Sequence, residues 1–210
     1  MKVLVIGGQG YIGSYLVPYL TENNILTTCY GSRELDYNKL DKSYLEVYTH
    51  IIILAGHSSV QMCLDDLQSP WKNNVRNLKN IIDKTNKDQT IIYASSASVY
   101  GNKGTKLYTE EDISVDFVNN YDLTKVTIDL LASKYMTQGR KIIGLRFGTV
   151  NGGSSVIRND QYDTTMHFQE EVLPGVDSFT NTQICIPNGW WLSIDDVTYI
   201  IDTLNGYTGL

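Results

Sequence analysis

Short apolar runs alternate with longer stretches of helical periodicity along most of the chain. The apolar, β-branched runs at 3–6 and 51–56 have the character of buried parallel strands. The complete set of predicted strands is 3–6, 25–30, a very short 35–37, 51–56, a strand beginning at 90 and ending in small polar residues before 101, 142–147 and 183–186. Helical patterns follow residue 13 and cover 38–47, 65–87 with an interruption or start near Pro70, 120–135, 163–171 and 194–204. Strands that alternate with helices indicate an α/β fold with a doubly wound parallel sheet.

The first predicted strand runs into a turn with glycines at 7, 10 and 13, and an apolar helical pattern follows. A strand, a glycine-rich turn and a helix in this order form the fingerprint of a dinucleotide-binding Rossmann unit. Gly7 permits the tight turn, Gly10 lets a pyrophosphate approach the backbone, and Gly13 lets helix and strand pack closely. The amino terminus of the helix then presents free N–H groups to the phosphates. The plain alternative is an apolar strand followed by an ordinary glycine turn.

The end of the second predicted strand bears on the choice of dinucleotide. An NAD site usually places Asp or Glu there for the ribose hydroxyl, whereas an NADP site uses Arg and small polar groups for the 2′-phosphate. Here Gly31 stands where the acid is expected, and Ser32 and Arg33 follow. The sequence therefore favours NADP(H) and leaves NAD(H) as the alternative. Arg33 as a solvated loop cation is the competing interpretation.

Tyr121 and Lys125 are spaced by four residues in a predicted helix, so they lie on one helix face. This is the one Tyr-x-x-x-Lys in a chain with 15 tyrosines. A phenol with its usual pKa near 10 is a poor base at neutral pH, and we expect a neighbouring ammonium and an oxidised nicotinamide to lower that pKa. Ser96, at the carboxyl end of a predicted strand, is placed to hydrogen-bond the same substrate oxygen. The competing interpretation is that both side chains merely cover the helix.

Composition and charge indicate which classes of binding partner are not expected. The formal net charge is −6 and no run of Lys or Arg occurs, so duplex nucleic acid is not expected as a partner. No apolar run approaches the length of about 20 residues that spans a membrane, and no signal peptide is visible. Three cysteines without CxxC spacing favour reduced thiols and a cytoplasmic location. Three scattered histidines give no metal-ligand spacing, so no metal is expected.

Four motifs in the same order carry a resemblance to a known family. These are Gly-Gly-Gln-Gly-Tyr-Ile-Gly at 7–13, Ser-Ser-Ala-Ser-Val-Tyr-Gly at 95–101, Tyr-Asp-Leu-Thr-Lys at 121–125, and Leu-Arg-Phe-Gly-Thr-Val-Asn-Gly at 145–152. The chain resembles an extended short-chain dehydrogenase/reductase, the family of nucleotide-sugar epimerases, dehydratases and reductases. The resemblance implies an NAD(P)-binding Rossmann domain at 1–152 and a reduced substrate cap with a closing helix at 153–210.

The resemblance also implies roles for individual residues. The catalytic residues would be Ser96, Tyr121 and Lys125. The cofactor-binding residues would be Gly7, Gly10, Tyr11, Ile12, Gly13, Ser32, Arg33, Leu54, Ala55, Gly56 and Lys125. The substrate-binding residues would be Ser96, Ser98, Thr149 and Arg158. Asn74 resembles the helix asparagine that the family carries near its active site, and a structural role is the alternative. The implied partner is a nucleotide-diphosphate sugar.

Some positions depart from the family pattern. Thr149 stands where many members have a substrate-contacting Asn, and Gly189-Trp190-Trp191 stands where nucleotide-sugar enzymes often have an Arg. The chain is also shorter than the usual family length. Two alternatives therefore stay open, an NADPH-dependent reductase of a small non-sugar carbonyl compound and a non-catalytic dinucleotide sensor. Family members often pair through two long helices, so the resemblance also implies a homodimer through 65–87 and 120–135.

Overall fold

The computed structural model describes residues 1–31, 40–64, 68–101, 108–114, 116–148, 150 and 183–186. The strands are β1 (Lys2–Ile6), β2 (Leu26–Tyr30), β3 (His50–Ile53), β4 (Thr90–Ser96), β5 (Lys141–Phe147) and β6 (Gln183–Ile186). The helices are α1 (Gly13–Glu22), α2 (Lys42–Leu45), α3 (Gln68–Pro70), the π-helical segment Trp71–Arg76, α4 (Asn77–Lys84) and α5 (Asn120–Met136), with single 3-10 turns at Gln61–Cys63 and Ala97–Tyr100.

The strands form one parallel sheet in the order β2-β1-β3-β4-β5-β6. The chain leaves β1 for β2 on one side and later returns to place β3 on the other side of β1. In open α/β sheets a ligand binds outside the carboxyl ends of the strands at such a switch point. A ligand site is therefore expected at the carboxyl ends of β1 and β3.

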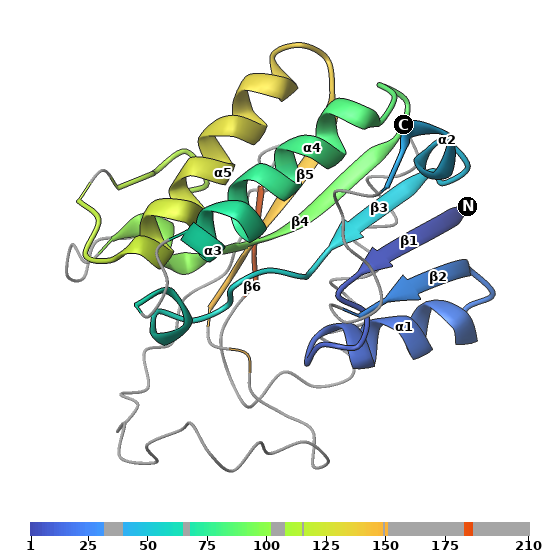
Figure 1. Ribbon diagram of the computed structural model, residues 1–210, viewed down its shortest axis with the longest axis horizontal. Helices are drawn as coiled ribbons and strands as arrows, with labels where there is room; N and C mark the ends of the chain where they lie inside the picture. The colour runs from blue at the N-terminus through green and yellow to red at the C-terminus, as the bar shows by residue number, and fades with distance from the viewer. Residues whose placement is uncertain are drawn as a thin grey trace.

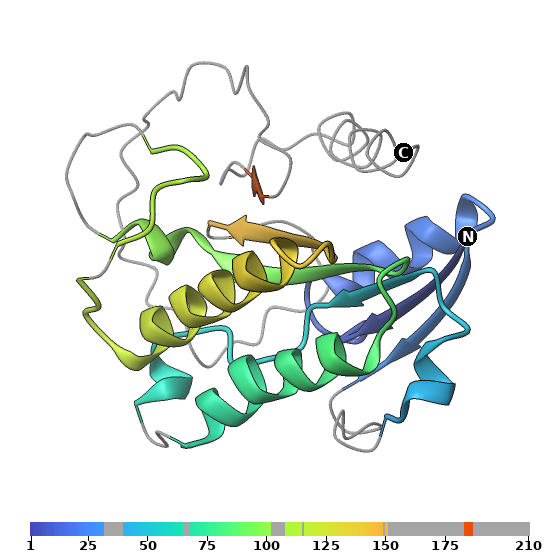
Figure 2. The same ribbon diagram turned by 90° about the horizontal axis from the view of Figure 1, so that it is seen from above.

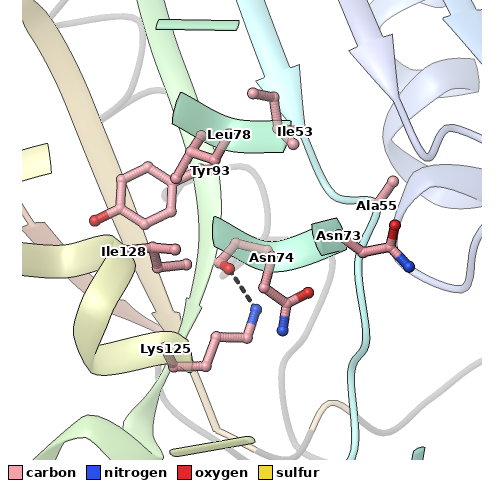
Figure 3. Close-up of a pocket in the computed structure, with 9 residues that line it drawn as sticks. Ile53, Ala55, Asn73, Asn74, Leu78, Tyr93, Lys125 and Ile128 are labelled. Atoms are coloured by element: carbon pink, nitrogen blue, oxygen red, sulfur yellow. Dashed lines mark hydrogen bonds between the residues drawn. The ribbon is translucent and has the colours of Figure 1, made fainter. Parts of the chain in front are cut away.

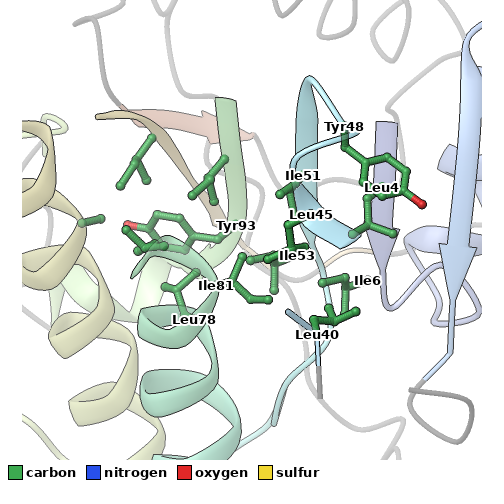
Figure 4. Close-up of a cluster of buried hydrophobic side chains, with 14 of the residues drawn as sticks. Leu4, Ile6, Leu40, Leu45, Tyr48, Ile51, Ile53, Leu78, Ile81 and Tyr93 are labelled. Atoms are coloured by element: carbon green, nitrogen blue, oxygen red, sulfur yellow. The ribbon is translucent and has the colours of Figure 1, made fainter. Parts of the chain in front are cut away.

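Helices cover both faces of the sheet, with α1 on one face and α4 and α5 side by side on the other (Figures 1 and 2). Successive strand residues point to opposite faces. One core cluster accordingly holds Leu4, Ile6, Ile51, Ile53, Ile91 and Tyr93 beneath α2, α4 and α5 (Figure 4). The opposite cluster holds Val3, Val5, Ile52 and Ile92 against Leu20 of α1. Strands that are apolar on both faces explain why the sequence showed continuous apolar runs instead of alternation.

These observations confirm the predicted α/β doubly wound sheet. Strand 183–186 occurs as predicted, and α5 begins at Asn120 as predicted and ends one residue late, at Met136. The helix predicted over 38–47 is shorter among the described residues, because α2 has four residues and starts where the Asp41 side chain accepts the N–H of Tyr44. The predicted interruption near Pro70 is a π-helical segment that begins at Trp71.

Several predictions lie outside the described residues. They are the short strand 35–37, the helices 163–171 and 194–204, and the positions Ser32, Arg33, Thr149, Arg158 and Trp190. The boundary between a nucleotide-binding domain and a cap at residue 152 stays a prediction.

Candidate active site

The glycine loop follows β1 and is held between the ends of its two neighbouring strands. The N–H groups of Gly7 and Gly8 donate to the carbonyl of Tyr30 at 2.8 and 3.1 Å. Gly7 has a φ of +94°, a conformation that glycine adopts without steric cost. A Cβ on Gly7 would lie 2.5 Å from the main-chain nitrogen of Ala55. The turn is therefore packed directly against β2 and the segment after β3.

The amino terminus of α1 follows this loop and lacks a side-chain cap. Ile12 occupies the capping position, and its side chain makes no capping hydrogen bond. Gly13 packs so closely on the loop that a Cβ would lie 2.6 Å from the Cα of Gly8. Gly10 and Tyr11 are exposed beside it. An uncapped helix terminus next to a glycine cradle fits an anion such as a pyrophosphate.

The segment after β3 completes this edge of the sheet. The N–H groups of Leu54 and Ala55 both donate to the carbonyl of Ile6, at 2.8 and 3.0 Å. Gly56 lies against the side chain of Asn74, since a Cβ there would lie 2.6 Å from Asn74 Oδ1. The structure thus brings these three predicted cofactor residues beside the glycine loop.

Ser96, Tyr121 and Lys125 come together at the carboxyl end of β4. Ser96 is the last residue of β4, and Tyr121 and Lys125 lie in the first two turns of α5. Lys125 Nζ donates to the carbonyl of Ala94 at 2.8 Å (Figure 3). The same nitrogen lies 5.6 Å from the centroid of the Tyr121 ring. Ser96 Oγ accepts the N–H of Ser98 at 3.1 Å. The end of β4 and the start of α5 therefore meet in one small region.

The pKa of Tyr121 corrects an expectation from the sequence. Burial raises the pKa of the phenol, a hydrogen bond with Ser96 lowers it, and the neighbouring Cys63 and Asp122 raise it further, with a net shift upward. The expected lowering by Lys125 is wrong for the protein without a ligand, because removing the phenol from water outweighs the other influences. Tyr121 therefore holds its proton at neutral pH.

Lys125 is shifted in the opposite direction. Burial lowers the pKa of its ammonium to about 8 from an ordinary 10.5, although Asp129 and Cys63 both favour the charged form. The side chain is only 6% exposed. Lys125 is therefore still charged at neutral pH, and a modest change of surroundings is enough to take its proton.

Asn74 links the segment after β3 to α5. Its Oδ1 accepts the N–H of His57 at 2.8 Å, and its Nδ2 donates to the carbonyl of His57 at 3.2 Å and to Thr124 Oγ1 at 3.0 Å. The side chains of Asn74 and Lys125 line one cavity of about 10 Å³, shown in Figure 3, which is about the room that one water needs. The π-helical segment that carries Asn74 is a type of distortion often found at functional sites.

Two contributors to this region carried no clear signal in the sequence. Thr124 is fully buried and donates to the carbonyl of Tyr121 at 2.8 Å, but nothing in its spacing marks it. Cys63 is buried, and it is near enough to Tyr121 and Lys125 to raise the pKa of both. A single cysteine in a polar segment does not stand out in a sequence.

A buried ion pair lies one helical turn beyond Lys125. Arg146 of β5 donates from Nε to Asp129 Oδ2 at 3.0 Å, and the hydroxyl of Tyr93 donates to Asp129 Oδ1 at 2.8 Å. Both charged side chains are fully buried. This pair joins α5 to β4 and β5, which supports the helix that carries Tyr121 and Lys125.

The remaining predicted site residues are less constrained. Ser98 lies two residues after Ser96, and its hydroxyl has no hydrogen-bond partner among the residues that the structure describes.

Within the residues that the structure describes, no three His, Cys, Asp or Glu side chains are grouped to hold a metal ion. No helix in the described ranges is both long and apolar enough to cross a bilayer.

Comparison with known proteins adds an independent line of evidence. The model of the NAD dependent epimerase/dehydratase family matches residues 3–173. The UDP-glucose 4-epimerase of Lactobacillus helveticus is 28% identical over an alignment of 177 residues that covers 74% of this chain and 53% of that protein. The chain spans about half the length of the curated relatives that match along most of it.

Solved structures share the fold. The UDP-glucuronic acid 4-epimerase from Bacillus cereus, in complex with UDP-glucuronic acid and NAD, has a TM-score of 0.63 and 24% identity, over 72% of this chain and 58% of that one. RMD from Pseudomonas aeruginosa, complexed with NADPH, has a TM-score of 0.58 and 22% identity, over 72% of this chain and 56% of that one. At these identities the likeness is evidence for the fold.

Proposed function

The chain belongs to the NAD-dependent epimerase/dehydratase family, and on that basis we propose that it acts on a nucleotide-diphosphate sugar with a bound nicotinamide dinucleotide. The observation that carries the proposal is the convergence of Ser96, Tyr121 and Lys125 where β4 ends and α5 begins. The named relatives that act on UDP-sugars support the substrate class. The proposed reaction is an epimerisation, a dehydration or a reduction, because the same proton-transfer residues can serve all three.

The dinucleotide would be held by the residues around β1 and β3. The uncapped start of α1 and the glycine cradle fit its pyrophosphate, and Leu54, Ala55 and Gly56 flank it. When bound, the nicotinamide supplies the hydride acceptor or donor. We favour NADP(H) because Gly31 leaves no acid at the end of β2 and Arg33 follows. The structural neighbours with NAD keep NAD(H) as the alternative.

Tyr121 holds the proton that moves to or from the substrate oxygen. Its raised pKa makes the protonated phenol the resting form, which suits donation to a carbonyl oxygen. Ser96 lies within hydrogen-bond reach of that phenol and stabilises the substrate oxygen as negative charge develops on it. Lys125 lies beside the ring and stabilises the phenolate left after the proton has moved.

The decisive experiment replaces Tyr121 with Phe. We expect Tyr121→Phe to lower turnover of a nucleotide sugar by roughly 10²- to 10⁴-fold, the range for loss of a general acid, while dinucleotide affinity stays within about twofold. Tyr15→Phe, which changes an exposed tyrosine of α1, is the control and should keep wild-type turnover. Wild-type turnover in Tyr121→Phe would disprove the mechanism. A panel of nucleotide sugars that neither bind nor react would disprove the substrate class.

The implied homodimer has support from the arrangement of helices. α4 and α5 lie side by side on one face of the sheet (Figures 1 and 2). Leu130 of α5 is 56% exposed. We place the dimer interface on this face. Sedimentation of wild type and Leu130→Asp tests it, since a dimer through α5 should dissociate in the variant and a monomeric wild type would contradict it.

A further inference from the structure

The fully buried Arg146 of β5 reaches three other parts of the chain. Its Nε donates to Asp129 of α5 at 3.0 Å, and its Nη1 donates to the carbonyl of Asp112 at 3.1 Å. Its guanidinium carbon lies 4.8 Å from the centroid of the Tyr100 ring, a distance at which a cation is attracted to an aromatic face. One guanidinium thus contacts α5, the segment that contains Asp112 and the 3-10 turn that ends at Tyr100.

Two of these parts carry the two halves of the candidate active site. The 3-10 turn that ends at Tyr100 begins directly after Ser96, the last residue of β4. The helix α5 carries the tyrosine and the lysine of the site, and Asp129 lies one turn further along it. The Arg146 guanidinium therefore contacts both the turn that follows the serine and the helix that carries the proposed proton donor.

The segment that contains Asp112 is held to the same turn by contacts of its own. The N–H of Ser114 donates to the carbonyl of Val99 at 2.7 Å. The rings of Tyr100 and Tyr108 pack with their centroids 5.1 Å apart. A change at the guanidinium should therefore be felt by the turn and by this segment together.

We infer that Arg146 is a positioning residue for the proposed reaction, which sets the serine at the end of β4 against the tyrosine and lysine of α5. The inference rests on the proposed function. A planar guanidinium can donate in two directions and stack on a ring at the same time, which the point charge of an ammonium does not reproduce. Tyr121 and Ser96 must both meet one substrate oxygen, and a misplacement of about 1 Å can lower a rate by about 10²-fold.

Replacement of Arg146 by Lys tests this role, because it keeps the charge and removes the planar fork. We expect the kcat for a nucleotide sugar, measured per folded molecule, to fall by roughly 10- to 100-fold, as for a misplaced catalytic group. The Kd of the dinucleotide should stay within about twofold, because the dinucleotide binds at the ends of β1 and β3. Circular dichroism and urea unfolding give the folded fraction. A loss of stability alone would leave kcat per folded molecule unchanged.

Arg140→Lys is the matched control for this experiment. The Arg140 guanidinium also donates to main-chain carbonyls, those of Thr85 and Ile82, at 2.8 and 2.7 Å. Arg140 directly precedes β5, whereas Ser96 pairs with the last residue of that strand, so the two lie at opposite ends of the sheet. Arg140→Lys should lose stability and keep the kcat of the wild type.

A second pair of variants decides the matter if Arg146→Lys does not fold. Tyr100→Phe keeps the aromatic face against the guanidinium, and Tyr100→Leu removes it. We expect Tyr100→Leu to have the lower kcat of the two, with the dinucleotide Kd unchanged in both. The same kcat in both variants would overturn the inference.

The outcomes separate this inference from the function on which it rests. A wild type that turns over no nucleotide sugar would disprove both. An active wild type, together with an unchanged kcat in Arg146→Lys, would overturn the role of Arg146 and leave the proposed function intact. Equal losses of kcat in Arg140→Lys and Arg146→Lys would do the same.

Discussion

The side-chain amide of Asn74 donates to the hydroxyl of Thr124 at 3.0 Å, inside the protein and across 50 residues of sequence. The same Asn74 side chain forms two hydrogen bonds with the main chain of His57. The hydroxyl of Thr124 in turn donates to the carbonyl of Tyr121. One amide thus ties the segment after β3 to the first turn of α5, where the proposed proton donor lies.

Replacement of Thr124 by Val should destabilise the protein more than replacement of Thr127 by Val. The substitution leaves the buried Asn74 amide with the weaker of its two acceptors, and loss of such a partner costs about 1–3 kcal/mol. Thr127→Val is the matched control, because Thr127 makes a bond to Leu123 on the same helix and none with Asn74. Urea unfolding measures the difference. Equal costs for the two variants would contradict a special role for the Asn74–Thr124 bond.

The lowered pKa of Lys125 predicts a pH-dependent stability. The folded protein releases this proton at about pH 8, whereas the unfolded chain holds it up to about 10.5. Between these values the unfolded state holds this proton and the folded state does not, so the contribution of Lys125 to the free energy of unfolding should rise with pH. The rise should be on the order of 3 kcal/mol across that window. Lys125→Met should lack it in urea unfolding between pH 7.5 and 10.

An exposed lysine of the same helix provides the comparison for this experiment. Lys134→Met removes an exposed ammonium near the end of α5 and should keep the slope of the wild type. A Lys125→Met protein whose stability rises with pH as steeply as that of the wild type would show that Lys125 is not the group responsible.

The fold was predictable because its local signals agree with its long-range packing. Strands β1 and β3 are buried on both faces, so their apolar runs are unbroken and easy to recognise. Gly7 and Gly13 were recognised from their spacing, and the structure shows why glycine is needed there: both are closely packed, and Gly7 also has a positive φ. The strand order was not predicted, because residues at 50 and 90 become neighbours only through tertiary pairing.

The site was predictable in part. Tyr121 and Lys125 share a helix, so their spacing alone places them together. The direction of the Tyr121 pKa shift was not predictable, because it depends on how much water the folded chain removes from the phenol. The hydrogen bonds of Arg146 join it to residues 17 and 34 positions away, and such contacts leave no periodic pattern in the sequence.

Arg33 gives a further prediction on the cofactor, made from the sequence alone. If Arg33 binds the 2′-phosphate, Arg33→Ala should lower the affinity for NADPH by roughly tenfold, since one charge-assisted hydrogen bond contributes about 1.5–3 kcal/mol. The affinity for NADH should stay within about twofold. Titration of both dinucleotides measures the effect. Equal affinities of the wild type for NADH and NADPH, unchanged in the variant, would count against the preference for NADP(H).

The buried pair of Asp129 and Arg146 should be far more costly to break than the exposed pair of Lys79 and Asp83. Asp129→Asn leaves the fully buried Arg146 without its counter-charge, and breaking one side of a buried pair typically costs about 3–5 kcal/mol. Lys79→Ala removes one side of an i,i+4 pair whose side chains are 49% and 40% exposed, and such pairs contribute about 0–1 kcal/mol. Urea unfolding of both variants compares the two costs. Because Asp129 lies one turn beyond Lys125 and anchors α5 to β5, Asp129→Asn should also lower turnover. A loss of stability below about 1 kcal/mol in Asp129→Asn would show that the pair does not hold the helix in place.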